Sequence, residues 1–140
     1  MIDELYSREI LRRTAQLDHV GRLKAPDGAA DRTAKLCGST IHVEVKLADG
    51  VITDFAQEVE ACALGQAAAA ILSQSVIEAP VVEVIAARDA MKAMLKGGAF
   101  DYPERFADFA ILQSVKDFPA RHASTLLALE ATVEAAGRAG

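Results

Sequence analysis

A polar turn between two β-forming segments constrains the fold of this chain more than any other feature of its sequence. Residues 40–47, TIHVEVKL, alternate strictly between polar and apolar side chains, and residues 51–59 begin with further β-forming residues. Alternation of this kind is typical of a strand with one buried face, and the Asp49-Gly50 pair is a favoured hairpin turn. We therefore predict an antiparallel hairpin. Its predicted buried residues are Ile41, Val43, Val45 and Leu47, and its predicted solvated residues are Thr40, His42, Glu44 and Lys46.

Two loop lengths are compatible with this turn, and they give different strand registers. A two-residue loop sets Val45 against Asp54, which mixes apolar and polar residues on one face. A three-residue loop, residues 48–50, sets Val43 against Phe55 and keeps the apolar face together. Because a one-residue slip moves every side chain to the other face, we prefer the three-residue loop.

Helical patterns dominate the rest of the chain. Residues 63–79 are rich in alanine, carry no charge before Glu78 and stop at Pro80, which predicts a helix buried on nearly all sides. Further helices are predicted at residues 5–17, 82–96, 102–115 and 119–136. Residues 25–31 have the composition of a loop, and the residues around 32–36 are a candidate third strand.

The strands precede most of the helices, which indicates the α+β class. We expect a small antiparallel three-stranded sheet with about five helices, mostly packed on one face. With 140 residues, of which 51% are hydrophobic and 25% charged, the chain has the length and balance of one globular domain, residues 1–140.

Charge and hydropathy exclude several classes of partner. The net charge of −5 opposes a nucleic-acid or anionic-membrane surface, which needs a basic patch. No run approaches the roughly 18 apolar residues of a membrane span, and the N-terminus lacks the basic-then-apolar layout of a secretion signal. We therefore expect a cytoplasmic protein that binds neither nucleic acid nor membrane.

Cys37 and Cys62 are the only two cysteines, and they lie at nearly equal distances on either side of the turn. Either register brings them to the same end of the hairpin, where directly paired Cα atoms are about 4.5–5.5 Å apart. Two thiolates at that spacing can share one metal ion, and the start of the helix at residue 63 favours a thiolate at Cys62. The alternative is that each cysteine is a small buried core residue.

Four segments, in order and with their spacing kept, resemble the iron–sulfur cluster assembly scaffold family, the NifU-like or IscU/SufU-type proteins. They are LYSREIL (residues 5–11) followed by Gly21 and Leu23, CGSTIHVEVKLADGVITDF (37–55), EACALGQAAAAILSQSV (60–76) and FPARHASTLLALEA (118–131). The resemblance implies a protein on which a [2Fe–2S] cluster is assembled, or which holds zinc in the same site. It also implies a cysteine desulfurase and acceptor apoproteins as partners.

The family uses three cysteines and an aspartate, and this chain keeps two of the four. Carried over by position, the first cysteine is Cys37 and the second is Cys62, whereas Ser39 stands at the aspartate and Ser124 at the third cysteine. The family's N-P-R-N segment is also absent, and its place is taken by residues 16–19, QLDH. A [2Fe–2S] cluster normally takes four ligands, mostly thiolates, and serine is a poor ligand for such metals.

The missing ligands can come from His122, from water or from a partner chain, so the metal candidates are Cys37, Cys62 and His122. His122 lies two residues before Ser124, a spacing that does not place both on one helical face.

Three functions are compatible with these residues: a scaffold with a reduced ligand set, a metal-free module that docks a desulfurase or assembly factor, and a thiol enzyme that uses Cys62. We rank the enzyme last, because no base stands at a readable spacing.

Overall fold

The computed structural model describes residues 8–35 and 38–139, and it confirms the α+β class. Three strands are followed by most of the helices. The described elements are α2 (Arg8–Thr14), β1 (Gly28–Ala34), β2 (Ser39–Ala48), β3 (Val51–Glu60), α3 (Ala63–Ser73), α4 (Val81–Leu95), the 3-10 helices η1 (Glu104–Asp117) and η2 (Pro119–Arg121), and α5 (His122–Arg138).

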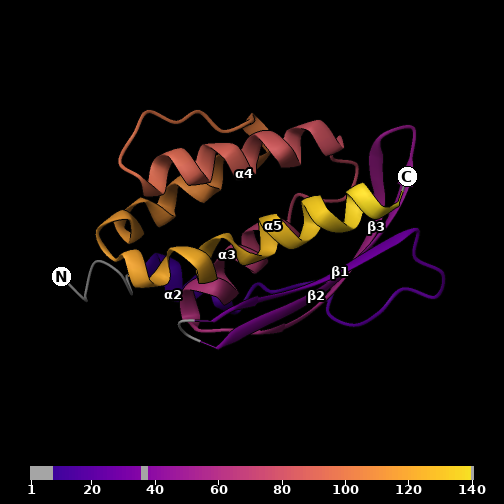
Figure 1. The fold of residues 1–140 in the computed structure, drawn as a ribbon, viewed down its shortest axis with the longest axis horizontal. Helices are drawn as coiled ribbons and strands as arrows, with labels where there is room; N and C mark the ends of the chain where they lie inside the picture. The colour runs from indigo at the N-terminus through magenta and orange to yellow at the C-terminus, as the bar shows by residue number, and fades with distance from the viewer. Residues whose placement is uncertain (1–7, 36–37, 140) are drawn as a thin grey trace.

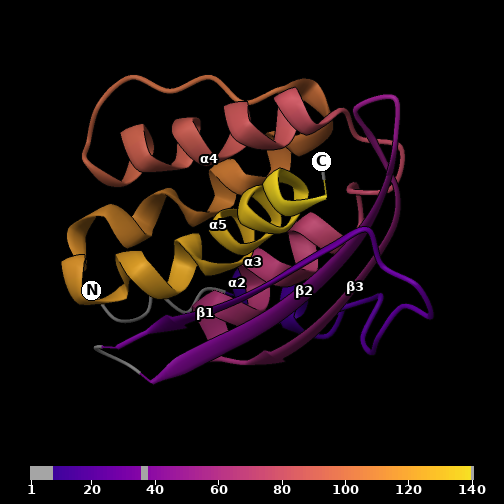
Figure 2. The ribbon, with the colours of Figure 1, turned by 45° about the vertical axis from the view of Figure 1, so that its right-hand side comes forward.

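The sheet is antiparallel in the order β1-β2-β3, and the helices lie on one side of it (Figures 1 and 2). Helix α5 is central, since it packs against β1, β2, α3 and α4. Helix α3 packs beside α5 and contacts α2, and η1 packs on α3 and α4. The predicted arrangement of helices on one face is therefore confirmed. None of the helices in the described part of the chain is long and apolar enough to cross a membrane.

The hairpin turn has two residues, so the preferred three-residue loop is wrong. Asp49 and Gly50 both have positive φ, 53° and 76°, and Ala48 pairs with Val51. Such a turn follows the right-handed twist of the strands. The apolar residues are matched by a register shift between Lys46 and Leu47, a β-bulge, and not by a longer loop.

Strand β1 begins four residues before the candidate strand, inside the segment predicted to be a loop. Gly28 and Ala30 are buried because α5 lies directly on them. A Cβ at Gly28 would stand 2.1 Å from the carbonyl oxygen of Ala135. Small residues are therefore required here for packing. Because small residues are also common in loops, this part of the strand was predicted to be a loop.

Two predicted helices differ from the structure. Helix α3 ends at Ser73 and not at residue 79, because the chain turns to pair with the hairpin: the N–H of Ile52 donates to the carbonyl of Ala79 at 2.9 Å. The segment predicted as a helix at 102–115 is the 3-10 helix η1. Its buried residues recur every three positions, which is the period of a 3-10 helix. They are Phe106, Phe109, Leu112 and Val115.

Candidate functional site

Three of the predicted site residues meet at the start of α3. Ser39 begins β2, Cys62 is the N-cap residue of α3, and Ser124 lies in the first turn of α5. The hydroxyl oxygen of Ser124 is 3.1 Å from that of Ser39 and 3.2 Å from the sulfur of Cys62. The backbone N–H of Cys62 donates to the hydroxyl of Ser39 at 3.4 Å. These three side chains therefore form one hydrogen-bonded group, called here the Ser-Ser-Cys group.

The Ser-Ser-Cys group has a buried end and an accessible end. Ser39 and Ser124 are 2% and 0% exposed, whereas Cys62 is half-buried. The first turn of α3 contains no acidic residue. The geometry thus places a reachable sulfur above two buried hydroxyls.

Gly65 permits this close approach of α3 to α5. A Cβ at this position would lie 2.8 Å from the hydroxyl oxygen of Ser124 and 2.8 Å from the Cβ of Ala61. A larger residue at position 65 would have to displace Ser124 or Ala61. From the sequence, Gly65 was expected to leave room for a ligand in the first helical turn after Cys62, and in the structure the atoms nearest to it belong to Ser124 and Ala61.

Cys37 lies outside the described residues, so its predicted pairing with Cys62 stays a prediction. The described residues around it do confirm that the start of β2 reaches the start of α3, because Cys62 contacts Ser39.

His122 is directed to another part of the molecule. Its Nε2 lies 3.0 Å from the carbonyl oxygen of Val115 and 3.2 Å from that of Lys116. A nitrogen in those contacts donates a proton to a backbone oxygen and does not bind a metal. The structure does not join His122 to the Ser-Ser-Cys group, and its role as a ligand stays a prediction.

The donor atoms do not match a four-ligand [2Fe–2S] set. The group contributes one thiol and two neutral hydroxyls, and the whole sequence holds two cysteines. Among residues 8–35 and 38–139, no three His, Cys, Asp or Glu side chains are grouped so that they could hold a metal ion. Two thiolates, if Cys37 joins Cys62, suit a single ion better than a complete cluster.

A second polar cluster lies on the other face of the sheet, where the sequence predicted solvated residues. The Nδ1 of His42 is 2.8 Å from a carboxylate oxygen of Asp31, and its Nε2 is 2.8 Å from one of Glu44. Glu44 is only 5% exposed, so its predicted solvation is wrong. The other oxygen of Glu44 accepts the N–H of Leu23 at 2.8 Å. The segment before β1 therefore folds over this face and buries it.

The hydrogen bond with Glu44, followed by the contact with Asp31, raises the pKa of His42 above its ordinary value of 6.5 against the opposing effect of burial. The same hydrogen bond lowers the pKa of Glu44 below 4.5, with further help from the N–H of Leu23. This cluster is an ion-paired support for the sheet and has no contact with the Ser-Ser-Cys group among the described hydrogen bonds.

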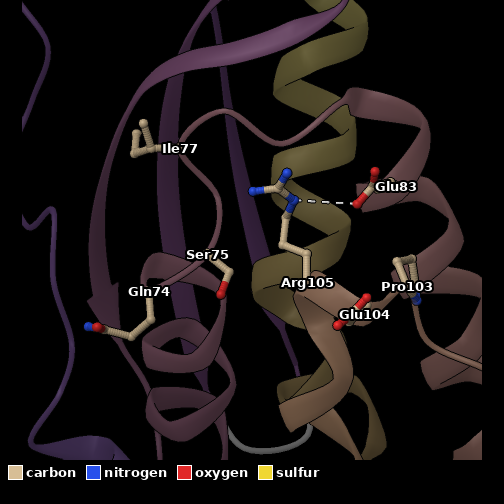
Figure 3. A pocket seen from close by; sticks show the side chains of 7 residues that line it. All are labelled: Gln74, Ser75, Ile77, Glu83, Pro103, Glu104 and Arg105. Carbon is tan, nitrogen blue, oxygen red and sulfur yellow. Dashed lines mark hydrogen bonds and ion pairs between the residues drawn. The ribbon is translucent and has the colours of Figure 1, made fainter.

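A cavity of about 720 Å³ lies at the opposite end of α3 (Figure 3). Gln74 and Ser75, which follow α3, line one side of it, and an ion pair of 3.4 Å between Glu83 and Arg105 lies on the other. Helix α3 has 11 residues and is therefore about 16 Å long, so this cavity is separate from Cys62.

Known proteins are similar to this chain in sequence and in fold. Residues 5–125 match the NifU-like N terminal domain family. The iron-sulfur cluster assembly scaffold protein IscU of Thermotoga maritima is 28% identical over 99 residues, which are 71% of this chain and 69% of that protein. The zinc-dependent sulfurtransferase SufU of Bacillus subtilis is 26% identical over 91 residues, which are 65% of this chain and 62% of that protein.

Solved structures agree with these matches. The N-terminal part of a NifU-like protein from Brucella abortus has 46% sequence identity and a TM-score of 0.93, with 99% of this chain and 96% of that chain covered. FiSufU from Fervidobacterium islandicum has a TM-score of 0.87 at 19% identity, with 96% and 98% covered, which shows a common fold.

Proposed function

This chain belongs to the NifU-like N terminal domain family, and from that membership we propose that it acts as a scaffold-like protein in iron–sulfur cluster assembly. Cys37 and Cys62 hold the cargo, which is iron, a [2Fe–2S] cluster or zinc. A cysteine desulfurase supplies sulfur, and acceptor apoproteins receive the product. The chain works in the cytoplasm as a carrier and not as an enzyme.

The observation that supports this function is the meeting of Ser39, Cys62 and Ser124. These three positions resemble family ligand positions, and they come together from three different elements. The half-buried sulfur of Cys62 can be reached by a partner protein. The hydroxyl of Ser124 lies 3.2 Å from this sulfur and forms a hydrogen bond with it. A site with few thiolates releases its cargo readily, as a transfer protein requires.

Metal content of the purified protein tests the proposal. We expect the wild-type chain, purified without oxygen, to contain iron or zinc in a constant ratio to protein. The Cys62→Ala and Cys37→Ser variants should lose this metal, because each removes one of two thiolates. Ser75→Ala, at the far end of α3, is the matched control and should keep it. Metal that survives in both cysteine variants would contradict the assignment of these ligands.

The hydrogen bond between Ser39 and Ser124 favours a second candidate, a module that docks a desulfurase or assembly factor without metal. Hydroxyls in such a contact satisfy each other and need no ion. Absence of metal together with co-purification of a pyridoxal-dependent desulfurase would support it. A thiol enzyme is less well supported, because within the described part of the chain Cys62 bonds to hydroxyls and to no His or carboxylate that could act as its base.

A further inference from the structure

We infer that Ser39 and Ser124 determine the cargo of the site: they limit the chain to one metal ion and exclude a [2Fe–2S] cluster. This inference rests on the proposed function, and it selects among the three cargoes named there.

The number of thiolates is the first argument. The sequence has two cysteines, so one chain offers at most two sulfur ligands. A [2Fe–2S] cluster normally requires four protein ligands, most of them thiolates. A single zinc ion needs four ligands, of which water or a substrate can supply one, so two thiolates come closer to its ligand set than to that of a cluster.

The state of the two hydroxyls is the second argument. Ser124 already contacts Ser39 at 3.1 Å and Cys62 at 3.2 Å, in a position with 0% exposure. To bind iron, Ser124 would have to lose its proton and give up its hydrogen bonds. Within the described residues its side chain contacts no cation that would stabilise an alkoxide. Neutral hydroxyls are also poor ligands for metals that prefer thiolate.

The space around Ser124 is the third argument. Because Gly65 has no side chain, the hydroxyl of Ser124 stands against open backbone where a Cβ would lie 2.8 Å away. A sulfur in place of this oxygen would meet no side chain of residue 65. A sulfur at position 124 would stand beside that of Cys62, and one at position 39 would stand beside position 124 and the backbone N–H of Cys62. The side-chain oxygens of Ser39 and Ser124, where a cluster site would have further thiolate ligands, thus make this a site for a single ion.

Anaerobic reconstitution tests this inference. The wild-type chain and the double variant Ser39→Cys with Ser124→Cys are incubated with ferric iron and sulfide, which together have the oxidation state of a [2Fe–2S] cluster, and are then desalted. Iron, acid-labile sulfide and visible absorption are measured per chain. We expect the wild type to keep at most one iron and no sulfide. The double variant should keep two irons and two sulfides and gain the visible absorption of a [2Fe–2S] cluster.

A second variant, Ser39→Ala with Ser124→Ala, keeps the inference falsifiable if the cysteine variant does not fold. It should keep the single metal ion of the wild type, because the hydroxyls are not ligands. Loss of that ion from a folded protein, shown by an unchanged circular dichroism spectrum, would overturn the inference. A [2Fe–2S] cluster on the wild-type chain, as a monomer or a dimer, would overturn it and leave the proposed function intact. A wild-type chain that binds neither iron nor zinc would contradict both this inference and the proposed function.

Discussion

Cys62 and Ser124 are 62 residues apart in the sequence, and the sulfur of one lies 3.2 Å from the hydroxyl oxygen of the other. This contact joins the start of α3 to the start of α5. Both helices begin at the same corner of the molecule, so a change in their separation changes the surroundings of the sulfur directly.

Gly65→Ala should disturb this corner. The added methyl would stand 2.8 Å from both the Ser124 hydroxyl and the Ala61 Cβ, so the helices must move apart. We expect the free energy of unfolding to fall by about 1–3 kcal/mol in urea denaturation, the usual cost of overpacking. The same variant should retain less metal after desalting.

Gly137→Ala is the matched control for that variant. Gly137 lies in α5, and a Cβ there meets nothing within 4 Å. Alanine is the better helix former, so stability should stay constant or rise by up to about 1 kcal/mol. Equal losses of stability in the two glycine variants would show that crowding at Gly65 is unimportant.

The stability of the protein should depend on pH through His42. Its pKa is raised in the folded state, so its contribution is fully present below about pH 6.5 and is lost as the pH rises through the raised value. The pKa of Glu44 is lowered, so its contribution is present above about pH 4.5 and is lost as the pH falls through the lowered value. The cluster should therefore stabilise the fold most between these two values.

Urea denaturation of the wild type and of His42→Gln, at several pH values, measures this dependence. The difference in unfolding free energy between the two proteins should shrink as the pH rises above neutrality. A difference that is constant from about pH 6 to pH 9 would show that His42 does not titrate in this range.

Glu44→Gln should lower the pKa of His42 towards its ordinary value. The variant keeps the size of the side chain and replaces the carboxylate whose hydrogen bond to His42 contributes most to the shift. A titration of the His42 ring followed by NMR measures the effect. Glu58→Gln is the control, because Glu58 is paired with Arg22 and makes no hydrogen bond to the ring of His42. A larger shift in the control than in Glu44→Gln would contradict the assignment.

Gly50→Ala should weaken the hairpin. Gly50 has a φ of 76°, a conformation that costs a residue with a Cβ about 1–2 kcal/mol. Asp49→Asn is the control, since asparagine tolerates the φ of 53° at that position. Thermal unfolding should show a lower midpoint for Gly50→Ala and little change for Asp49→Asn. Equal midpoints in wild type and Gly50→Ala would argue against a strained turn.

Local patterns in the sequence were sufficient for the hairpin and for most helices, but not for features that depend on distant contacts. Asp49-Gly50 identified the turn, whereas the β-bulge beyond it leaves only a short break in alternation, where residues 53 and 54 are both exposed between buried Ile52 and Phe55. Glu44 was expected in solvent because it lies on the polar face of its strand. In the structure the N–H of Leu23, 21 residues earlier in the chain, binds its carboxylate. Gly28 and Ala30 were assigned to a loop because small residues are typical of loops. In the structure they are small because α5, about 100 residues later in the chain, packs on them.

In the candidate site too, local sequence patterns predicted one contact and did not predict the other. The approach of Cys62 to the start of β2 was predictable from the hairpin. The contact between Cys62 and Ser124 was suggested by family resemblance alone, since no spacing rule connects residues on two helices so far apart. The three-residue period of η1 was present in the sequence, but its apolar residues fit a helix of either kind closely enough to conceal the difference.

Four consecutive residues in the middle of helix α3 have side chains too short to repack. Ala67, Ala68, Ala69 and Ala70 are all 0% exposed, and each is in contact through a methyl group or the backbone alone. A flexible side chain can absorb a neighbour's displacement by changing rotamer, and alanine has no rotamer to change. At these four positions a shift of a packed neighbour, such as α5, is therefore passed to the backbone of α3 and is not absorbed by a side chain.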